Sequence, residues 1–131
     1  MGDNIMNAPE FFEMHEGYSS YRPCRHLSMQ EAIELCASIL IFARGHKIRH
    51  LLLDTTRLTG FDSPGTWERF VIGNRCAQAA QGIVKVALLA RPEMIDPQHF
   101  GMTVARNRGL DGEVFSAEPD ALVWLLDKPS A

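Results

Sequence analysis

A polar segment after a leucine-rich run contains the residues best placed for chemistry. The apolar run 51–53 ends in Asp54, and a serine follows at Ser63, directly before Pro64. Serine is a preferred N-terminal cap of a helix, and proline is a preferred first helical residue. The pattern therefore predicts a helix over 64–80 that is capped by Ser63. A hydroxyl at a helix start is also a candidate phosphate acceptor, because the unpaired N–H groups there stabilise an anion.

The residues around Ser63 do not match the pattern of a serine hydrolase. Their spacing is Gly-x-x-Ser-x-Gly, whereas a nucleophile elbow has Gly-x-Ser-x-Gly. Pro64 also lacks the backbone N–H that would stabilise an oxyanion at this place. The sequence contains no P-loop, dinucleotide-binding or EF-hand motif. We therefore predict no catalytic residues and do not expect an enzyme.

Cysteine and histidine are spread along the chain without the spacing of a metal site. The three cysteines are Cys24, Cys36 and Cys76, and the one close Cys/His pair is Cys24 with His26. A zinc site needs about four converging ligands, and an odd cysteine count gives no disulfide framework. We expect no metal, no cofactor and a reducing, cytoplasmic setting.

Length and composition are typical of one globular domain. The 131 residues carry a net charge of -3, and 46% of them are hydrophobic. The negative charge argues against nucleic acid as a partner, because no overall positive field exists to hold a polyanion. No apolar run is long enough to cross a membrane. We expect a single domain over 11–127, a flexible N-terminus over 1–10 and a tail over 128–131.

The hydrophobic pattern predicts alternating strands and helices. Short alternation over 11–22 on either side of Gly17 indicates a β-hairpin. Ser28 and Glu31 have the spacing of a capping box, which begins a helix that Gly45 ends. The other expected elements are strands at 50–54, 83–90 and 113–116 and helices at 97–107 and 119–126. Together they predict an α/β domain with a mostly parallel central sheet, an N-terminal hairpin and about four helices.

Two sequence patterns point to a known family. In the first, an aliphatic strand ends in an acidic residue, and a hydrophobic residue then precedes Asp-Ser-x-Gly at a helix start. In the second, Gly-Leu precedes a short strand with Phe and a helix with Ala-Leu. The positions are Asp54, Phe61, Asp62, Ser63 and Gly65, and then Gly109, Leu110, Val114, Phe115, Ala121 and Leu122. These patterns resemble the STAS domain of bacterial anti-sigma factor antagonists, the SpoIIAA-like family. Pro64 departs from that family, which has a second hydroxyl there.

The resemblance implies a STAS-like fold and a non-catalytic role in bacterial signalling. The domain would bind a regulatory protein, such as a kinase-like partner, and phosphate on Ser63 would release it. The implied recognition surface comprises Asp54, Phe61, Asp62, Ser63, Gly65 and Trp67. An alternative is the binding of a small apolar or anionic molecule, which would need an internal pocket reached from segment 54–65. Arg91 follows the expected strand 83–90 and should lie near the Ser63 loop, where it either helps to form a groove or is merely solvated.

The helix over 64–80 has apolar side chains on more than one side. Trp67 and Phe70 are expected to meet the sheet, whereas Ile72 and Cys76 lie largely on the opposite side. This excess predicts either a homodimer or partner contact through Ile72 and Cys76, or cover by another part of the same chain.

Two arginines near the expected end of helix 97–107 have two interpretations. Arg106 and Arg108 stand just before Gly109. Cations near a helix C-terminus are stabilised by the helix dipole, so their role is either electrostatic capping or the binding of a small anion.

Overall fold

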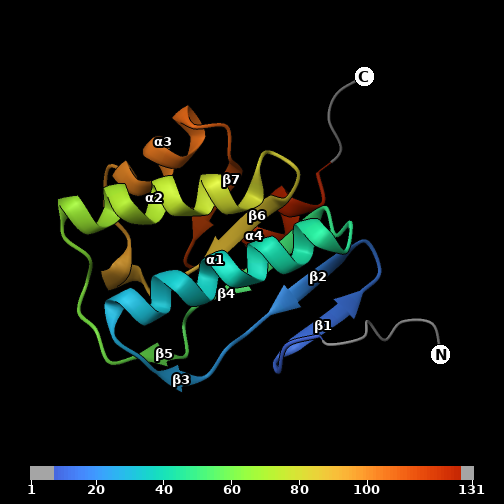
Figure 1. Ribbon diagram of the computed structural model, residues 1–131, viewed down its shortest axis with the longest axis horizontal. Coiled ribbons are helices and arrows are strands. Elements are labelled where there is room, and N and C mark those ends of the chain that lie inside the picture. The colour runs from blue at the N-terminus through green and yellow to red at the C-terminus, as the bar shows by residue number, and fades with distance from the viewer. Residues whose placement is uncertain (1–7, 128–131) are drawn as a thin grey trace.

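A five-stranded sheet forms the centre of the computed structural model, which describes residues 8–127 (Figure 1). Its strand order is β1-β2-β4-β6-β7. The strands are β1 (Phe12–His15), β2 (Tyr18–Tyr21), β4 (His50–Asp54), β6 (Lys85–Leu89) and β7 (Asp111–Phe115). β1 pairs antiparallel with β2, and every other neighbouring pair is parallel. The predicted α/β architecture with an N-terminal hairpin is confirmed.

Helices cover both faces of this sheet. They are α1 (Met29–Gly45), α2 (Thr66–Ala80), α3 (Phe100–Asn107) and α4 (Glu118–Leu125), together with the 3-10 helix η1 (Pro92–Met94). Leu51 and Leu53 of β4 belong to the core cluster that contains residues of α1 and α2, whereas Leu52 packs with α4. Because successive strand residues point to opposite faces, α1, α2 and α3 lie on one face and α4 lies on the other (Figure 1).

The start of α1 agrees with the sequence prediction. The Glu31 N–H donates to the Ser28 hydroxyl at 3.1 Å, and the Ser28 N–H donates to the Glu31 carboxylate at 2.9 Å. These are the two reciprocal bonds of a capping box. Gly45 is the last helical residue, as expected.

The start of α2 differs from the prediction. The helix begins at Thr66 with Gly65 as its cap, so neither Ser63 nor Pro64 has its predicted role. The Glu68 carboxylate accepts the Gly65 N–H at 2.9 Å. A side chain from within the helix therefore satisfies the backbone donor, and no hydroxyl before it is required.

Helix α3 also begins later than the predicted residue 97. His99 has a left-handed backbone with φ of 54°, which a right-handed helix cannot contain. The Asp96 carboxylate accepts the N–H of Phe100 at 2.8 Å and thereby fixes the start of the helix. The final helix has Pro119 in its first turn, as predicted.

No helix in the described part, 8–127, is long and apolar enough to cross a membrane. Most of the predicted flexible N-terminus, 1–7, and the predicted tail, 128–131, lie outside the described residues.

Candidate functional site

An apolar cavity lies between the sheet and the helices α1, α2 and α3. Its volume is about 170 Å³. Its walls come from α1 (Ala32, Ile33, Cys36, Leu40), α2 (Ile72, Gly73, Cys76), α3 (Gly101, Met102, Ala105) and the sheet (Leu53, Val86, Leu88, Val114). Well-packed interiors leave few voids larger than a water molecule. A space of this size beneath three helices is therefore a candidate binding site.

The mouth of the cavity lies at the carboxyl ends of β4 and β6. The lining residues here are partly exposed: Thr55, Phe61 and Pro64 come from the loop after β4, and Arg91 comes from the segment after β6. Ligands of open α/β sheets commonly bind beyond these strand ends. The sequence prediction that Arg91 lies near the Ser63 loop and helps to form a groove therefore agrees with the structure.

A short two-stranded ladder holds the loop after β4 in place. β3 (Arg25–His26) pairs in parallel with β5 (Leu58–Thr59), and the Leu27 N–H donates to the Thr59 carbonyl at 2.7 Å. Gly60 lies so close to the Leu27 carbonyl that a side-chain carbon there would overlap with it. The mouth is thus anchored to the segment that precedes α1.

Two glycines place α3 as a wall of the cavity. A side-chain carbon at Gly73 of α2 would overlap with the backbone oxygen of Gly101 of α3. The absence of that carbon lets the two helices approach closely and brings Met102 and Ala105 to the cavity.

Arg69 links two segments at the mouth. Its Nη1 donates to the Met94 carbonyl at 3.1 Å, and its Nη2 donates to the Ser63 hydroxyl at 3.0 Å. Among the described residues no carboxylate lies within ion-pair distance of Arg69. The guanidinium therefore holds η1 and the Ser63 loop together while keeping its charge unpaired.

Arg91 has weak contacts at the same mouth. Its Nη2 donates to the Leu58 carbonyl at 3.5 Å, and its Nε lies 3.7 Å from a Glu93 carboxylate oxygen. The Nε is buried, and no hydrogen-bond partner is found for it in the described structure. Buried donors nearly always have a partner, so an unpaired Nε–H is uncommon. This donor is the unused hydrogen-bonding capacity of the Arg91 guanidinium.

Two thiols face the cavity from adjacent helices. Burial raises the pKa of Cys76 to about 11, and burial also raises the pKa of Cys36, with a smaller contribution from Cys76. A raised pKa keeps a thiol protonated and unreactive at neutral pH. Both side chains therefore act as apolar wall groups.

The structure changes the interpretation of the outer face of α2. Ile72 and Cys76 line the cavity, which agrees with the second of the two alternatives, cover by another part of the same chain. Trp67 is 71% exposed and stacks on Phe70, which contradicts its predicted contact with the sheet. The reason is that small residues form the buried side of α2, namely Gly73, Ala77, Ala79 and Ala80, so the bulky side chain of Trp67 lies on another side of the helix.

The predicted recognition residues separate into two groups. Asp62, Ser63 and Gly65 are exposed in the loop before α2, and Phe61 packs beside Leu58 at the cavity mouth. Asp54 is not part of that surface, because it is buried on the face that carries α4.

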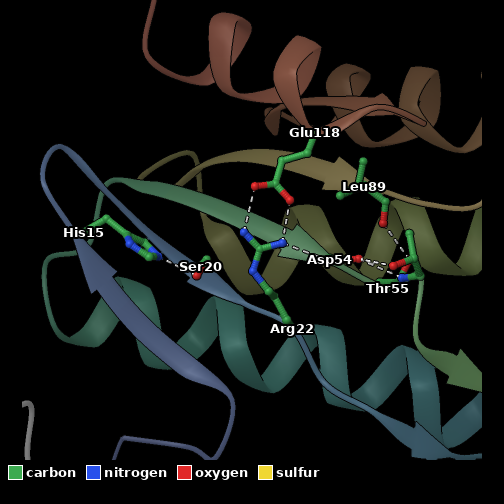
Figure 2. Close-up of polar contacts among 8 residues, drawn as sticks. His15, Ser20, Arg22, Asp54, Thr55, Leu89 and Glu118 are labelled. Carbon is green, nitrogen blue, oxygen red and sulfur yellow. Dashed lines mark hydrogen bonds and ion pairs between the residues drawn. The ribbon is translucent and has the colours of Figure 1, made fainter.

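An ionic network that was not predicted holds Asp54 (Figure 2). Arg22 follows β2 and donates to Asp54 at 3.1 Å and to the two Glu118 carboxylate oxygens at 2.7 and 2.9 Å. Asp54 also accepts the Thr56 N–H at 2.9 Å and the Thr56 hydroxyl at 2.6 Å. The hydrogen bonds from Arg22 lower the pKa of Glu118, although partial burial opposes the shift. The network ties the start of α4 to β2 and β4.

A serine and a histidine meet beside this network. His15 Nε2 lies 2.8 Å from the Ser20 hydroxyl oxygen, a distance at which a base could activate a nucleophile. Ser20, however, is completely buried. Since a substrate cannot reach it in this conformation, the pair satisfies a buried hydroxyl and links β1 to β2 (Figure 2).

The two predicted anion-binding arginines have partners in the fold. Arg106 donates to the Gly112 carbonyl at 2.9 Å and forms an ion pair with Glu113. Burial acts to raise the pKa of Glu113, but the Val114 N–H and Arg106 outweigh it, so the pKa is lowered. Arg108 lies over the ring of Phe70 at 5.6 Å. These contacts agree better with a structural role than with an anion site.

Comparison with known proteins finds a likeness among solved structures. No protein-family model and no curated protein matches the chain. It is similar to the crystal structure of an uncharacterized protein from the DUF3478 family with a SpoIIAA-like fold, from Shewanella loihica PV-4. The match covers 87% of this chain and 90% of that chain, with 21% identity and a TM-score of 0.47.

Proposed function

We propose that this protein is a non-catalytic domain that binds a small apolar molecule in the cavity beneath α1, α2 and α3. The observation that carries the proposal is the apolar space of about 170 Å³, which opens at the loop after β4. An apolar cavity of about 150 Å³ is large enough to bind benzene. The expected ligand therefore has a small ring or a short aliphatic chain, with roughly six to ten non-hydrogen atoms.

The energetics of packing support this function. An empty cavity lowers stability because its lining loses van der Waals contacts and hydrophobic burial. A ligand that fills the space restores those contacts. A cavity that must admit a ligand accounts for this loss of stability, whereas a purely structural core would be more stable without the cavity.

The test compares two cysteine substitutions. Binding of 1-hexanol is followed by ¹H-¹⁵N NMR titration in the wild type, in Cys36→Phe and in Cys24→Phe. Cys36 lines the cavity and Cys24 is exposed elsewhere. Phenylalanine at 36 should fill the space and weaken binding at least about tenfold, whereas phenylalanine at 24 should leave the affinity unchanged. Equal affinity in all three proteins, or no binding in the wild type, would contradict the proposal.

A second candidate function is partner binding controlled at Ser63. It is supported by one contact: the exposed Ser63 hydroxyl accepts a hydrogen bond from Arg69, so a phosphate on Ser63 would meet a guanidinium without a carboxylate partner. Such a phosphate would strengthen the link between α2 and the loop and would add negative charge beside Asp62. A regulatory protein that docks on this loop would then be released.

Phosphopeptide mass spectrometry of the protein from its native cells tests this second function. The switch requires phosphate on Ser63 and a different set of captured proteins for Ser63→Asp and for the wild type. Ser63→Asn serves as the control, because it keeps a neutral polar side chain of similar size. Identical partners for all three forms would exclude the switch.

A further inference from the structure

The polar groups at the cavity mouth differ in kind from its walls. Most of the lining is aliphatic or sulfur-containing, whereas Arg69 and Arg91 are lining residues that are partly exposed at its outer end. The mouth also holds one carboxylate, Asp96, but that carboxylate accepts the backbone N–H of Phe100. An apolar interior with two cations at its entrance suits a molecule that has an apolar body and an anionic end.

The hydrogen bonding of Arg91 carries the argument further. A guanidinium has five N–H donors arranged to bind a carboxylate through two parallel bonds. Arg91 uses its donors only in a 3.5 Å contact with the Leu58 carbonyl and a 3.7 Å contact with Glu93, which is itself exposed. Its buried Nε has no partner in the described structure. A carboxylate at the mouth would provide the hydrogen bonds that this side chain lacks.

Arg69 adds a second cation, and unlike Arg91, which is paired with Glu93, it has no carboxylate within ion-pair distance in the described chain. It already donates to Met94 and Ser63, so its side chain is held in place at the mouth. A fixed cation loses little conformational freedom on binding, which favours a ligand with a complementary charge. Arg69 therefore contributes attraction, and Arg91 contributes the unused hydrogen bonds.

We propose that the ligand is a small amphipathic carboxylate, with its apolar part in the cavity and its carboxylate bound by Arg91 beside Arg69. This inference rests on the proposed ligand-binding function and names its substrate class. The volume of about 170 Å³ limits the apolar part to a short chain or one small ring.

The test uses three probes with the same six-carbon chain: hexanoate, 1-hexanol and hexylammonium. Their affinities are measured by NMR titration at constant pH 7 and ionic strength. In the wild type, hexanoate should bind about tenfold more tightly than 1-hexanol, because it gains charge-assisted hydrogen bonds, and hexylammonium should bind most weakly.

Substitution of Arg91 should remove the preference for hexanoate over 1-hexanol without removing the binding of 1-hexanol. In Arg91→Gln the affinity for hexanoate should fall to that for 1-hexanol, while the affinity for 1-hexanol itself stays within about twofold of the wild type. The unchanged binding of 1-hexanol also shows that the variant is folded. Arg49→Gln is the control, since Arg49 is exposed before β4, at the opposite edge of the sheet.

The outcomes separate this inference from the function on which it rests. Equal binding of hexanoate and 1-hexanol to the wild type overturns the assigned ligand class but leaves the cavity as a binding site. A full preference for hexanoate in Arg91→Gln overturns the role of Arg91. If Arg91→Gln does not fold, the same comparison of hexanoate with 1-hexanol is made in Arg91→Lys. Lysine keeps the positive charge but lacks the paired donors of the guanidinium. Failure of all three probes to bind the wild type overturns both proposals.

Discussion

The sheet face under α4 and the face under α1, α2 and α3 use their polar groups in different ways. Under α4, the Arg22 guanidinium donates to two carboxylates, and Asp54 accepts further bonds from Thr56. At the cavity on the other face, Arg91 has only long contacts. In both regions an arginine lies at the edge of the sheet where the parallel strands end. Only Arg22, however, has short hydrogen bonds from its guanidinium to other side chains of the fold.

This difference suggests a structural role for the polar groups under α4 and a ligand-binding role for those at the cavity. Buried polar groups that are fully hydrogen-bonded hold elements in position, whereas donors that remain unused beside a cavity are available to a ligand. The α4 face has a compact core cluster that includes Leu52, Ala87 and Ala121. The opposite face has a larger cluster and a cavity of about 170 Å³. The proposed binding site therefore lies on the second face, and the contacts that attach α4 lie on the first.

Two neighbouring leucines of β4 provide the largest test of this comparison. Leu52 is 0% exposed beneath α4, and Leu53 is 2% exposed at the cavity. Leu52→Ala should lower the free energy of unfolding by about 4 kcal/mol, because it opens a new hole in a filled cluster. Leu53→Ala should cost only about 2 to 3 kcal/mol, because one side of that residue already borders the cavity and makes fewer protein contacts. Urea denaturation measures both values. Equal losses would contradict the difference in packing between the two faces.

The Arg22 network provides the next test. Arg22→Met removes the cation and leaves Asp54 buried without its ion partner, which should cost about 3 kcal/mol of unfolding free energy. Arg75→Met is the matched control, since Arg75 bonds both oxygens of Glu34 in an exposed pair. That control should cost less than about 1 kcal/mol. Similar losses in the two variants would show that the network under α4 is no more important than a surface pair.

Most of the fold could be predicted from local sequence rules. The capping residues Ser28 and Glu31 located the start of α1, and the apolar run before Asp54 identified a strand covered on both faces. Such signals depend on residues close together in sequence. The start of α2 was predicted wrongly because Ser63 and Pro64 gave a good local signal, while Glu68 satisfied the Gly65 N–H instead.

Less of the site could be predicted, because it depends on contacts between distant segments. Arg22 meets Glu118 across 96 positions, and no local pattern indicates that pairing. The cavity wall formed by α3 likewise depends on the close approach of Gly73 and Gly101, which are far apart in the sequence. The one useful signal was positional. Arg91 follows the strand next to β4, and segments after adjacent parallel strands meet at one edge of the sheet.

Titration of Glu118 provides the smallest test of the comparison. The hydrogen bonds from Arg22 lower its pKa below the ordinary value of 4.5, so folding favours the ionised carboxylate. The resulting stabilisation is present above pH 4.5 and is lost as the pH falls through the lowered pKa of the folded state. Glu118→Gln should therefore be less stable than the wild type at pH 7 by at most about 1 kcal/mol, since the side chain is partly exposed.

That deficit should shrink progressively below pH 4.5, because protonation makes the wild-type side chain neutral as well. Urea denaturation of both proteins at a series of pH values measures the difference. Glu34→Gln is the control on the exposed pair with Arg75. A Glu118→Gln deficit that stays constant as the pH falls would mean that the charge of Glu118 does not stabilise the attachment of α4. The contact of α4 with the sheet would then depend on its apolar cluster alone.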